Sequence, residues 1–212
     1  MTAKTEIYAD TLKEVYCFAA GHLAASLSKF LNQKIRIDLP QVWFRMPEKL
    51  VFLDEESKEP MLAISSEIGP EKKGRILHLL PQKSEKVLLG TVFGRKISKL
   101  EEMEESALLE IGNILSASIV SSIANFMGET ISIKQPYFNV APPPSIISQV
   151  LSEQERIINS HLFCSVKTFI NTESSNEVSF VSLFFPFFDI VGDIWKKLTI
   201  KILYEGKRKK IT

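Results

Sequence analysis

The residues whose spacing could support chemistry lie in the stretch from Ser106 to Gly128, which reads SALLEIGNILSASIVSSIANFMG. Ser106, Glu110 and Asn113 stand at positions i, i+4 and i+7, so on a helix their side chains share one stripe. A carboxylate can pair with a cation, and a carboxamide can both donate to and accept from a water molecule. Two interpretations stay open here: the pair belongs to a reactive surface, or it is the solvated side of an ordinary amphipathic helix.

A long amphipathic helix over residues 106–128 would position these side chains. Acidic residues dominate positions 101–105, where the N-terminal end of a helix favours negative charge. Gly128 follows the last apolar pair and is typical of a helix stop. Apolar residues recur at intervals of three, four and seven, the spacing of one buried helix face: Leu108, Ile111, Leu115, Ile119 and Phe126.

The first part of the chain repeats this pattern. The stretch from Asp10 to Leu31 is again helical in its periodicity, and an alignment of the chain with itself carries Asp10 onto Ser106. In that alignment Glu14 falls on Glu110 and Cys17 falls on Asn113. We therefore predict a duplicated unit, with repeats at about 8–95 and 104–200 in a single domain and a basic tail at 201–212. The identical positions are Leu12, Glu14, Ser26, Phe30, Ile35, Ile37 and Pro40, matching Leu108, Glu110, Ser122, Phe126, Ile131, Ile133 and Pro136.

Shorter elements complete each half. Hydrophobic alternation and turn residues predict strands at 35–40, 50–53, 61–68 and 75–80, and then a short helix at 84–93. In the second half they predict a helix at 145–155 with no counterpart in the first half. Strands at 161–170 and 178–185 follow, and a last helix runs to about residue 198.

Composition narrows the function class. The 212 residues are 45% hydrophobic, which is enough for a core, and the net charge of +1 favours neither nucleic acid nor a membrane surface. The longest uncharged run, residues 111–126, is too polar and too short to predict a membrane span, and the N-terminus has no signal-peptide core. Cys17 and Cys164 form no pairing framework, as is typical of a reducing compartment. We expect a soluble, cytoplasmic protein.

Known self-contained catalytic motifs do not occur in the sequence. It has no GxxxxGK[ST] phosphate loop, no GxGxxG and no HExxH. The two cysteines and His22, His78 and His161 show no zinc-ligand spacing, so each histidine is interpreted as a core or surface residue. Cys164 lies among apolar residues of an expected strand and is interpreted as a buried, unreactive thiol.

The spacing of Glu110 and Asn113 becomes more specific when Pro136 is included. The spacing Ser106-x3-Glu110-x2-Asn113-x22-Pro136 resembles the signature of the CheC/CheX/FliY family of chemotaxis phosphatases. The APPPS run at 141–145 is also similar to CheC. FliY has a further flagellar-switch domain after this region and CheX carries one copy per domain, so the resemblance is strongest to CheC.

The first copy keeps this pattern with one exception. Asp10-x3-Glu14-x2-Cys17-x22-Pro40 has cysteine where the family has asparagine. A thiol is a weak donor and a weak acceptor, and it is shorter than a carboxamide. The resemblance therefore implies a degenerate first site in which Asp10 and Glu14 can still contact a partner. Loss of the carboxamide alone, or burial of Cys17 in the core, would each explain the degeneracy.

The resemblance implies an α+β fold, in which a pseudo-two-fold duplicated domain carries two long motif-bearing helices and short helices on an antiparallel sheet. It implies hydrolysis of the aspartyl-phosphate on a CheY-like response regulator, which supplies its own Mg²⁺ and lysine, so no cofactor of this chain is expected. Asn113 would orient the attacking water, Glu110 would pair with the regulator's lysine, and Ser106 would contact the partner.

Two other functions remain open from the same resemblance. The chain could be a non-catalytic binding module for a CheD-like deamidase, or a structural component of a flagellar switch. Phosphate release from a phosphorylated receiver domain would distinguish the phosphatase function from these two.

Overall fold

A computed structural model describes residues 3–38, 41–45, 59–69, 74–152, 163–171 and 177–186. The strand expected at 50–53, the final helix, the basic tail and Pro40 lie outside these residues. The described elements, in chain order, are α1 (Ala3–Leu31), β1 (Arg36–Ile37), β2 (Gln41–Arg45), β3 (Met61–Ile68), β4 (Gly74–Pro81), α2 (Gln82–Phe93), α3 (Glu102–Met127), β5 (Tyr137–Ala141), α4 (Pro143–Ser152), β6 (Phe163–Asn171) and β7 (Glu177–Pro186).

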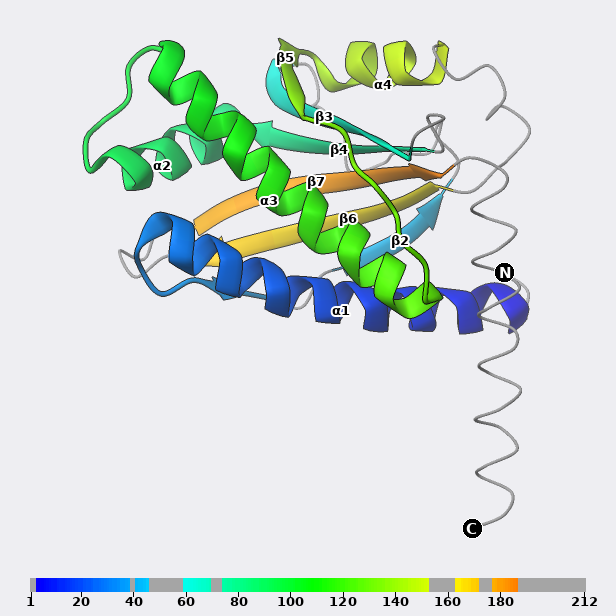
Figure 1. Cartoon of the computed structure of the whole chain (residues 1–212). Coiled ribbons are helices and arrows are strands. Elements are labelled where there is room, and N and C mark those ends of the chain that lie inside the picture. Colours follow the sequence, from blue (N-terminus) through cyan, green and yellow to red (C-terminus); the bar gives the residue numbers. More distant parts are fainter. Residues whose placement is uncertain are drawn as a thin grey trace.

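The strands form one antiparallel sheet in the order β1-β6-β7-β4-β3-β5, with β2 also paired to β6. Two hairpins, β3–β4 and β6–β7, meet along the β4–β7 pair. Each hairpin follows one long helix in the chain, α1 in the first half and α3 in the second. This arrangement is the expected α+β fold with a pseudo-two-fold duplication (Figure 1).

Helices cover both faces of the sheet. The long helices α1 and α3 pack on one face together with α2, whereas α4 packs on the other (Figure 1). Strand β4 needs cover on both faces, because its side chains alternate between them, with apolar residues on each. Ile76 and Leu80 lie in the clusters under the long helices, and Leu77 and Leu79 lie in the cluster under α4.

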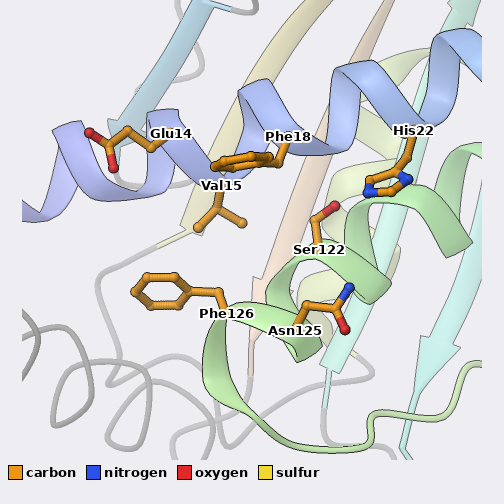
Figure 2. A pocket seen from close by; sticks show the side chains of 7 residues that line it. All are labelled: Glu14, Val15, Phe18, His22, Ser122, Asn125 and Phe126. Carbon is orange, nitrogen blue, oxygen red and sulfur yellow. The ribbon is translucent and has the colours of Figure 1, made fainter.

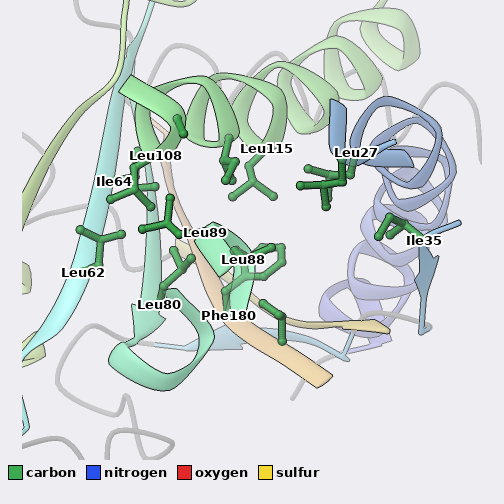
Figure 3. Packing of buried hydrophobic residues seen from close by; sticks show 14 of the residues in the cluster. Leu27, Ile35, Leu62, Ile64, Leu80, Leu88, Leu89, Leu108, Leu115 and Phe180 are labelled. Atoms are coloured by element: carbon green, nitrogen blue, oxygen red, sulfur yellow. The ribbon is translucent and has the colours of Figure 1, made fainter. Parts of the chain in front are cut away.

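The main core cluster joins both halves of the chain. Leu27 of α1, Leu108 and Leu115 of α3, and Leu88 of α2 meet there above the sheet (Figure 3). Each of these side chains is almost fully buried. Burial of such a side chain contributes about 1.5–3 kcal/mol, so this cluster fixes the long helices on the sheet.

The helix predicted at 106–128 is α3, and both of its ends have clear causes. At its start Glu101 and Glu104 form a reciprocal capping box, and the buried Glu104 carboxylate also accepts a hydrogen bond from Arg95. At its end Gly128 adopts the left-handed conformation, with φ of 64°. The N-terminal acidic residues thus cap the helix in addition to favouring its dipole.

Helix α3 is long and apolar enough by its composition to cross a membrane. Length and composition alone do not contradict the expectation that this stretch is no membrane span. In the structure 67% of the most apolar window is buried inside the fold, so α3 is a core helix here.

Two strands, β2 and β5, were not predicted from the sequence. The residues of β5 are mostly exposed and show no alternation, because β5 is an edge strand whose ladder partner is β3. The pairing of β2 depends on β6, which lies more than a hundred residues later in the chain. Neither pairing is encoded in local periodicity.

Candidate functional site

The motif of the second half lies on the outer face of α3. Ser106 and Glu110 are exposed, and Asn113 is partly buried, whereas Leu108 and Ile111 on the opposite face are fully buried. The Ser106 hydroxyl donates to the Glu102 carbonyl at 2.8 Å. The structure therefore brings these three side chains onto one accessible stripe of a helix whose other side is fixed in the core.

Directly beneath the motif, α3 approaches the sheet closely at Gly112. A Cβ atom added to Gly112 would lie 2.3 Å from Cγ2 of Ile64 on β3, far inside van der Waals contact. Gly112 stands between Glu110 and Asn113 in the sequence, so the absence of a side chain there sets the height of the motif above the sheet. The glycine inside the helical pattern was the available signal for this contact.

A buried polar network fixes the next turn of α3. Nε2 of His78 lies 2.9 Å from Oγ of Ser116, and Nδ1 of His78 lies 2.8 Å from Oγ of Ser182 on β7. Ser116 Oγ also lies 3.2 Å from Oγ of Ser66 on β3. Burial lowers the pKa of His78 to about 3, so the ring is neutral near pH 7, with one ring nitrogen donating and the other accepting. The sequence left His78 as a core or surface residue; it is a core residue bonded to α3.

The gap between Asn113 and Pro136 contains the end of α3 and the segment that returns along β3. Gly69 N–H donates to the Ser132 carbonyl at 2.8 Å, and Lys134 N–H donates to the Glu67 carbonyl at 2.9 Å. The Lys134 ammonium also pairs with the Glu67 carboxylate at 2.8 Å. Pro136 is buried immediately before β5. The motif proline thus belongs to the start of the edge strand.

The first copy of the motif lies on α1. Glu14 is exposed, and Cys17 is partly buried and not in a disulfide. Cys17 is partly buried, as Asn113 is, so full burial of the thiol does not explain the missing carboxamide. The side chain of Asp10 lies outside the described part of the structure.

A hollow of about 260 Å³ opens between the middle of α1 and the late part of α3. Phe18, which is 72% exposed, lies over it, and Glu14 and His22 lie toward opposite ends (Figure 2). Its other lining residues are Val15, Ser122, Asn125 and Phe126. The hollow adjoins the first copy of the motif and was not predicted from the sequence, because two helices distant in the chain form it.

The described part of the chain holds no cluster of possible metal ligands. There, no three His, Cys, Asp or Glu side chains come close enough to hold a metal ion. The α3 stripe presents the exposed carboxylate of Glu110 beside the carboxamide of Asn113.

Comparisons with known proteins connect this stripe to one family. The CheC-like family model matches residues 103–140, a region that contains Ser106, Glu110, Asn113 and Pro136. CheY-P phosphatase CheC of Bacillus subtilis is 24% identical over 153 residues, which cover 70% of this chain and 73% of that protein. CheC1 of Halobacterium salinarum is 29% identical over 158 residues, which cover 70% of this chain and 77% of that protein.

Solved structures share the fold at low sequence identity. FliY of Thermotoga maritima has a TM-score of 0.71 at 19% identity, and the match covers 95% of this chain and 98% of that one. The middle domain of FliM from H. pylori has a TM-score of 0.63 at 12% identity, covering 90% and 97%. The family-model match, the CheC relatives and the duplicated fold all support a resemblance of the chain to the CheC/CheX/FliY family of chemotaxis proteins.

Proposed function

We propose that this chain hydrolyses the aspartyl-phosphate of a CheY-like response regulator. The observation that carries the proposal is the pairing of an exposed Glu110 with a partly buried Asn113 on one helix face, inside the region matched by the CheC-like family model. The Bacillus subtilis relative is named for this activity, which supports the same reaction here.

In the proposed reaction Asn113 orients a water molecule. Its carbonyl oxygen accepts from the water and its amide group donates, so one side chain fixes the position of the nucleophile. The water oxygen forms a bond to phosphorus as the bond between phosphorus and the aspartate oxygen breaks. The aspartate leaves as a carboxylate and the water's proton passes to the phosphate, which completes the hydrolysis. Phosphoryl transfer of this kind depends on positioning and charge neutralisation rather than on a covalent group of the catalyst.

Glu110 would fix the helix against the regulator. An exposed carboxylate one turn from Asn113 can form a charge-assisted pair with a lysine ammonium beside the phosphate. Ser106, one further turn toward the start of α3, would extend the same contact. The Mg²⁺ needed to neutralise the phosphate would come with the regulator, and this chain would contribute no metal of its own.

The first copy would bind without hydrolysing. Glu14 offers an exposed carboxylate like that of Glu110, but Cys17 cannot both donate to and accept from a water as an amide does. We therefore assign Asp10 and Glu14 to partner contact. A CheD-like deamidase stays a proposed partner of the chain.

A second candidate function is favoured by the fold comparisons. The FliM middle domain from H. pylori resembles this chain over most of its length, and the FliM of that organism has been solved in complex with FliG. A structural role in a flagellar switch would use the same fold without turnover. It would require binding to a FliG-like protein, which a phosphatase does not.

A panel of phosphorylated receiver domains tests the proposal and identifies the substrate. We expect faster phosphate release from at least one CheY-like domain when the protein is added. Binding to a FliG-like protein with no acceleration on any receiver domain would favour the switch function instead.

A further inference from the structure

The polar network beneath α3 joins three strands to the motif helix. Ile64, His78 and Ser182 occupy one row across the sheet, since Ile64 pairs with His78 in β3–β4 and His78 pairs with Ser182 in β4–β7. Paired residues of antiparallel strands point to the same face, here the face that α3 covers. Helix α3 meets this row at two neighbouring points, Gly112 on Ile64 and Ser116 on His78.

We infer that the His78–Ser116 hydrogen bond is an anchor that positions Asn113, and this inference rests on the proposed phosphatase function. Asn113 lies between the two contact points, next to Gly112 and three residues before Ser116. Rotating or sliding this turn by about 1 Å would break the 2.9 Å bond to His78, because hydrogen bonds weaken steeply outside their short range. The carboxamide that orients the water is thereby fixed to the centre of the sheet.

His78 and Ser116 each have further partners besides their bond to one another. The other ring nitrogen of His78 is hydrogen-bonded to the Ser182 hydroxyl, and the Ser116 hydroxyl is also hydrogen-bonded to that of Ser66. The imidazole ring packs edge-on against Phe180, with ring centroids 6.1 Å apart. All four polar residues are 1% exposed or less. A buried network with every member paired holds one arrangement rather than several, because each change of partner would leave a buried polar atom unpaired.

The first half of the chain lacks both contact points. The alignment that carries Glu14 onto Glu110 carries Tyr16 onto Gly112 and Ala20 onto Ser116. Tyr16 is buried, so a large ring occupies the space where Gly112 allows close approach. Ala20 has no hydroxyl to bond to the sheet. The half that has lost the asparagine has therefore also lost the anchor, as expected if the anchor serves the asparagine.

The test compares Ser116→Ala with Ser118→Ala. Ser118 is also a buried serine of α3, but its hydroxyl donates to the Ile114 carbonyl of its own helix. At a temperature where both variants are folded, we expect Ser116→Ala to lower kcat for phosphate release by about tenfold with KM unchanged, since misplacement by about 1 Å can cost up to 10²-fold. Ser118→Ala should leave kcat within about twofold of the parent.

Amide hydrogen exchange supplies a readout that needs no substrate. Exchange of residues 110–117 should accelerate about tenfold in Ser116→Ala, with residues 119–127 unchanged, because local opening reports on the contacts of that turn. If the chain releases no phosphate from any receiver domain, the proposed function fails, and this exchange pattern still decides whether the anchor exists. Uniform acceleration along α3, or an unchanged kcat in an active protein, would overturn the inference.

A double variant covers the case in which Ser116→Ala does not fold. His78→Leu combined with Ser116→Ala removes both partners of the bond, so no buried ring nitrogen is left unpaired, although the hydroxyls of Ser66 and Ser182 each lose a partner. We expect it to fold, with a low kcat and fast exchange at 110–117. Normal kcat and normal exchange in this double variant would show that the network serves only the core.

Discussion

Asn113 and Glu110 differ in burial although they belong to one stripe. Glu110 is exposed and free to meet a partner's charge, whereas Asn113 is partly buried beside the contact of Gly112 with Ile64. This difference suits a division of roles in which the carboxylate binds and the carboxamide orients a water molecule. Each role gives its own prediction.

Replacing Asn113 tests the orienting role. Asn113→Ala should lower the rate of phosphate release on the order of 10²-fold, the usual cost of losing one positioning group, while the variant still binds the phosphorylated regulator. Asn125→Ala is the matched control, because Asn125 is an exposed asparagine three turns later on the same helix. Turnover of Asn113→Ala close to that of Asn125→Ala would remove Asn113 from the mechanism.

Replacing Glu110 tests the binding role. Glu110→Ala should weaken the affinity for the phosphorylated regulator, because it removes a charge-assisted contact with a lysine. Titration of a fluorescent, phosphorylated receiver domain measures this affinity directly. An unchanged dissociation constant would assign the contact to other residues of the stripe.

At the scale of the elements, the height of α3 above the sheet depends on Gly112. Gly112→Ala would press a methyl group onto Ile64, a fully buried and β-branched side chain that has few alternative rotamers. We expect the free energy of unfolding to fall by up to about 2 kcal/mol, because overpacking costs about 1–3 kcal/mol and the helix-propensity gain offsets only about 1 kcal/mol of it.

The control for Gly112→Ala is Gly21→Ala on α1. Gly21 is exposed, and a Cβ atom there meets nothing within 4 Å. This variant should raise the free energy of unfolding by about 0.5–1 kcal/mol through helix propensity alone. Urea denaturation of both variants measures the difference. Equal stabilisation by the two substitutions would mean that α3 is not in close contact with β3.

The long helices were predictable because their apolar faces repeat along the chain. Leu108, Ile111 and Leu115 lie in the core as their spacing indicates, and Gly128 ends α3. Strands β3, β4 and β7 were predictable because their apolar runs are bounded by turn residues. The edge strand β5 was not, because its residues are mostly exposed and its position is set by pairing with β3.

The candidate site was also predictable only in part. The stripe of Ser106, Glu110 and Asn113 follows from helical spacing alone. The bond between His78 and Ser116 does not, because it joins a strand to a helix across 38 positions of the chain, and nothing local marks either residue as a partner.

At the scale of the whole molecule, the buried His78 makes stability depend on pH. Its pKa is about 3 in the folded protein and about 6.5 in an unfolded chain, so below pH 6.5 the unfolded state binds the proton first. The free energy of unfolding should therefore fall by about 1.4 kcal/mol for each pH unit between 6.5 and 3 from this group alone.

His78→Gln isolates that contribution. Between pH 6.5 and 4.5 the free energy of unfolding of this variant should change with pH less steeply than that of the parent. The difference in slope should be about 1.4 kcal/mol per pH unit, which corresponds to one proton bound only by the unfolded state. His22→Gln is the control, because His22 is exposed and lies outside the buried network. Parallel pH profiles for the parent and His78→Gln would show that His78 is protonated in the folded protein.

The most direct test of the proposed function is a turnover measurement. The phosphorylated CheY-like domain is mixed with a small, substoichiometric amount of this protein, and inorganic phosphate is followed over time with Mg²⁺ present. The phosphatase account predicts that the decay rate rises in proportion to the protein added and that the whole regulator pool is dephosphorylated. An unchanged decay rate at equimolar protein, with the complex shown to form, would contradict it.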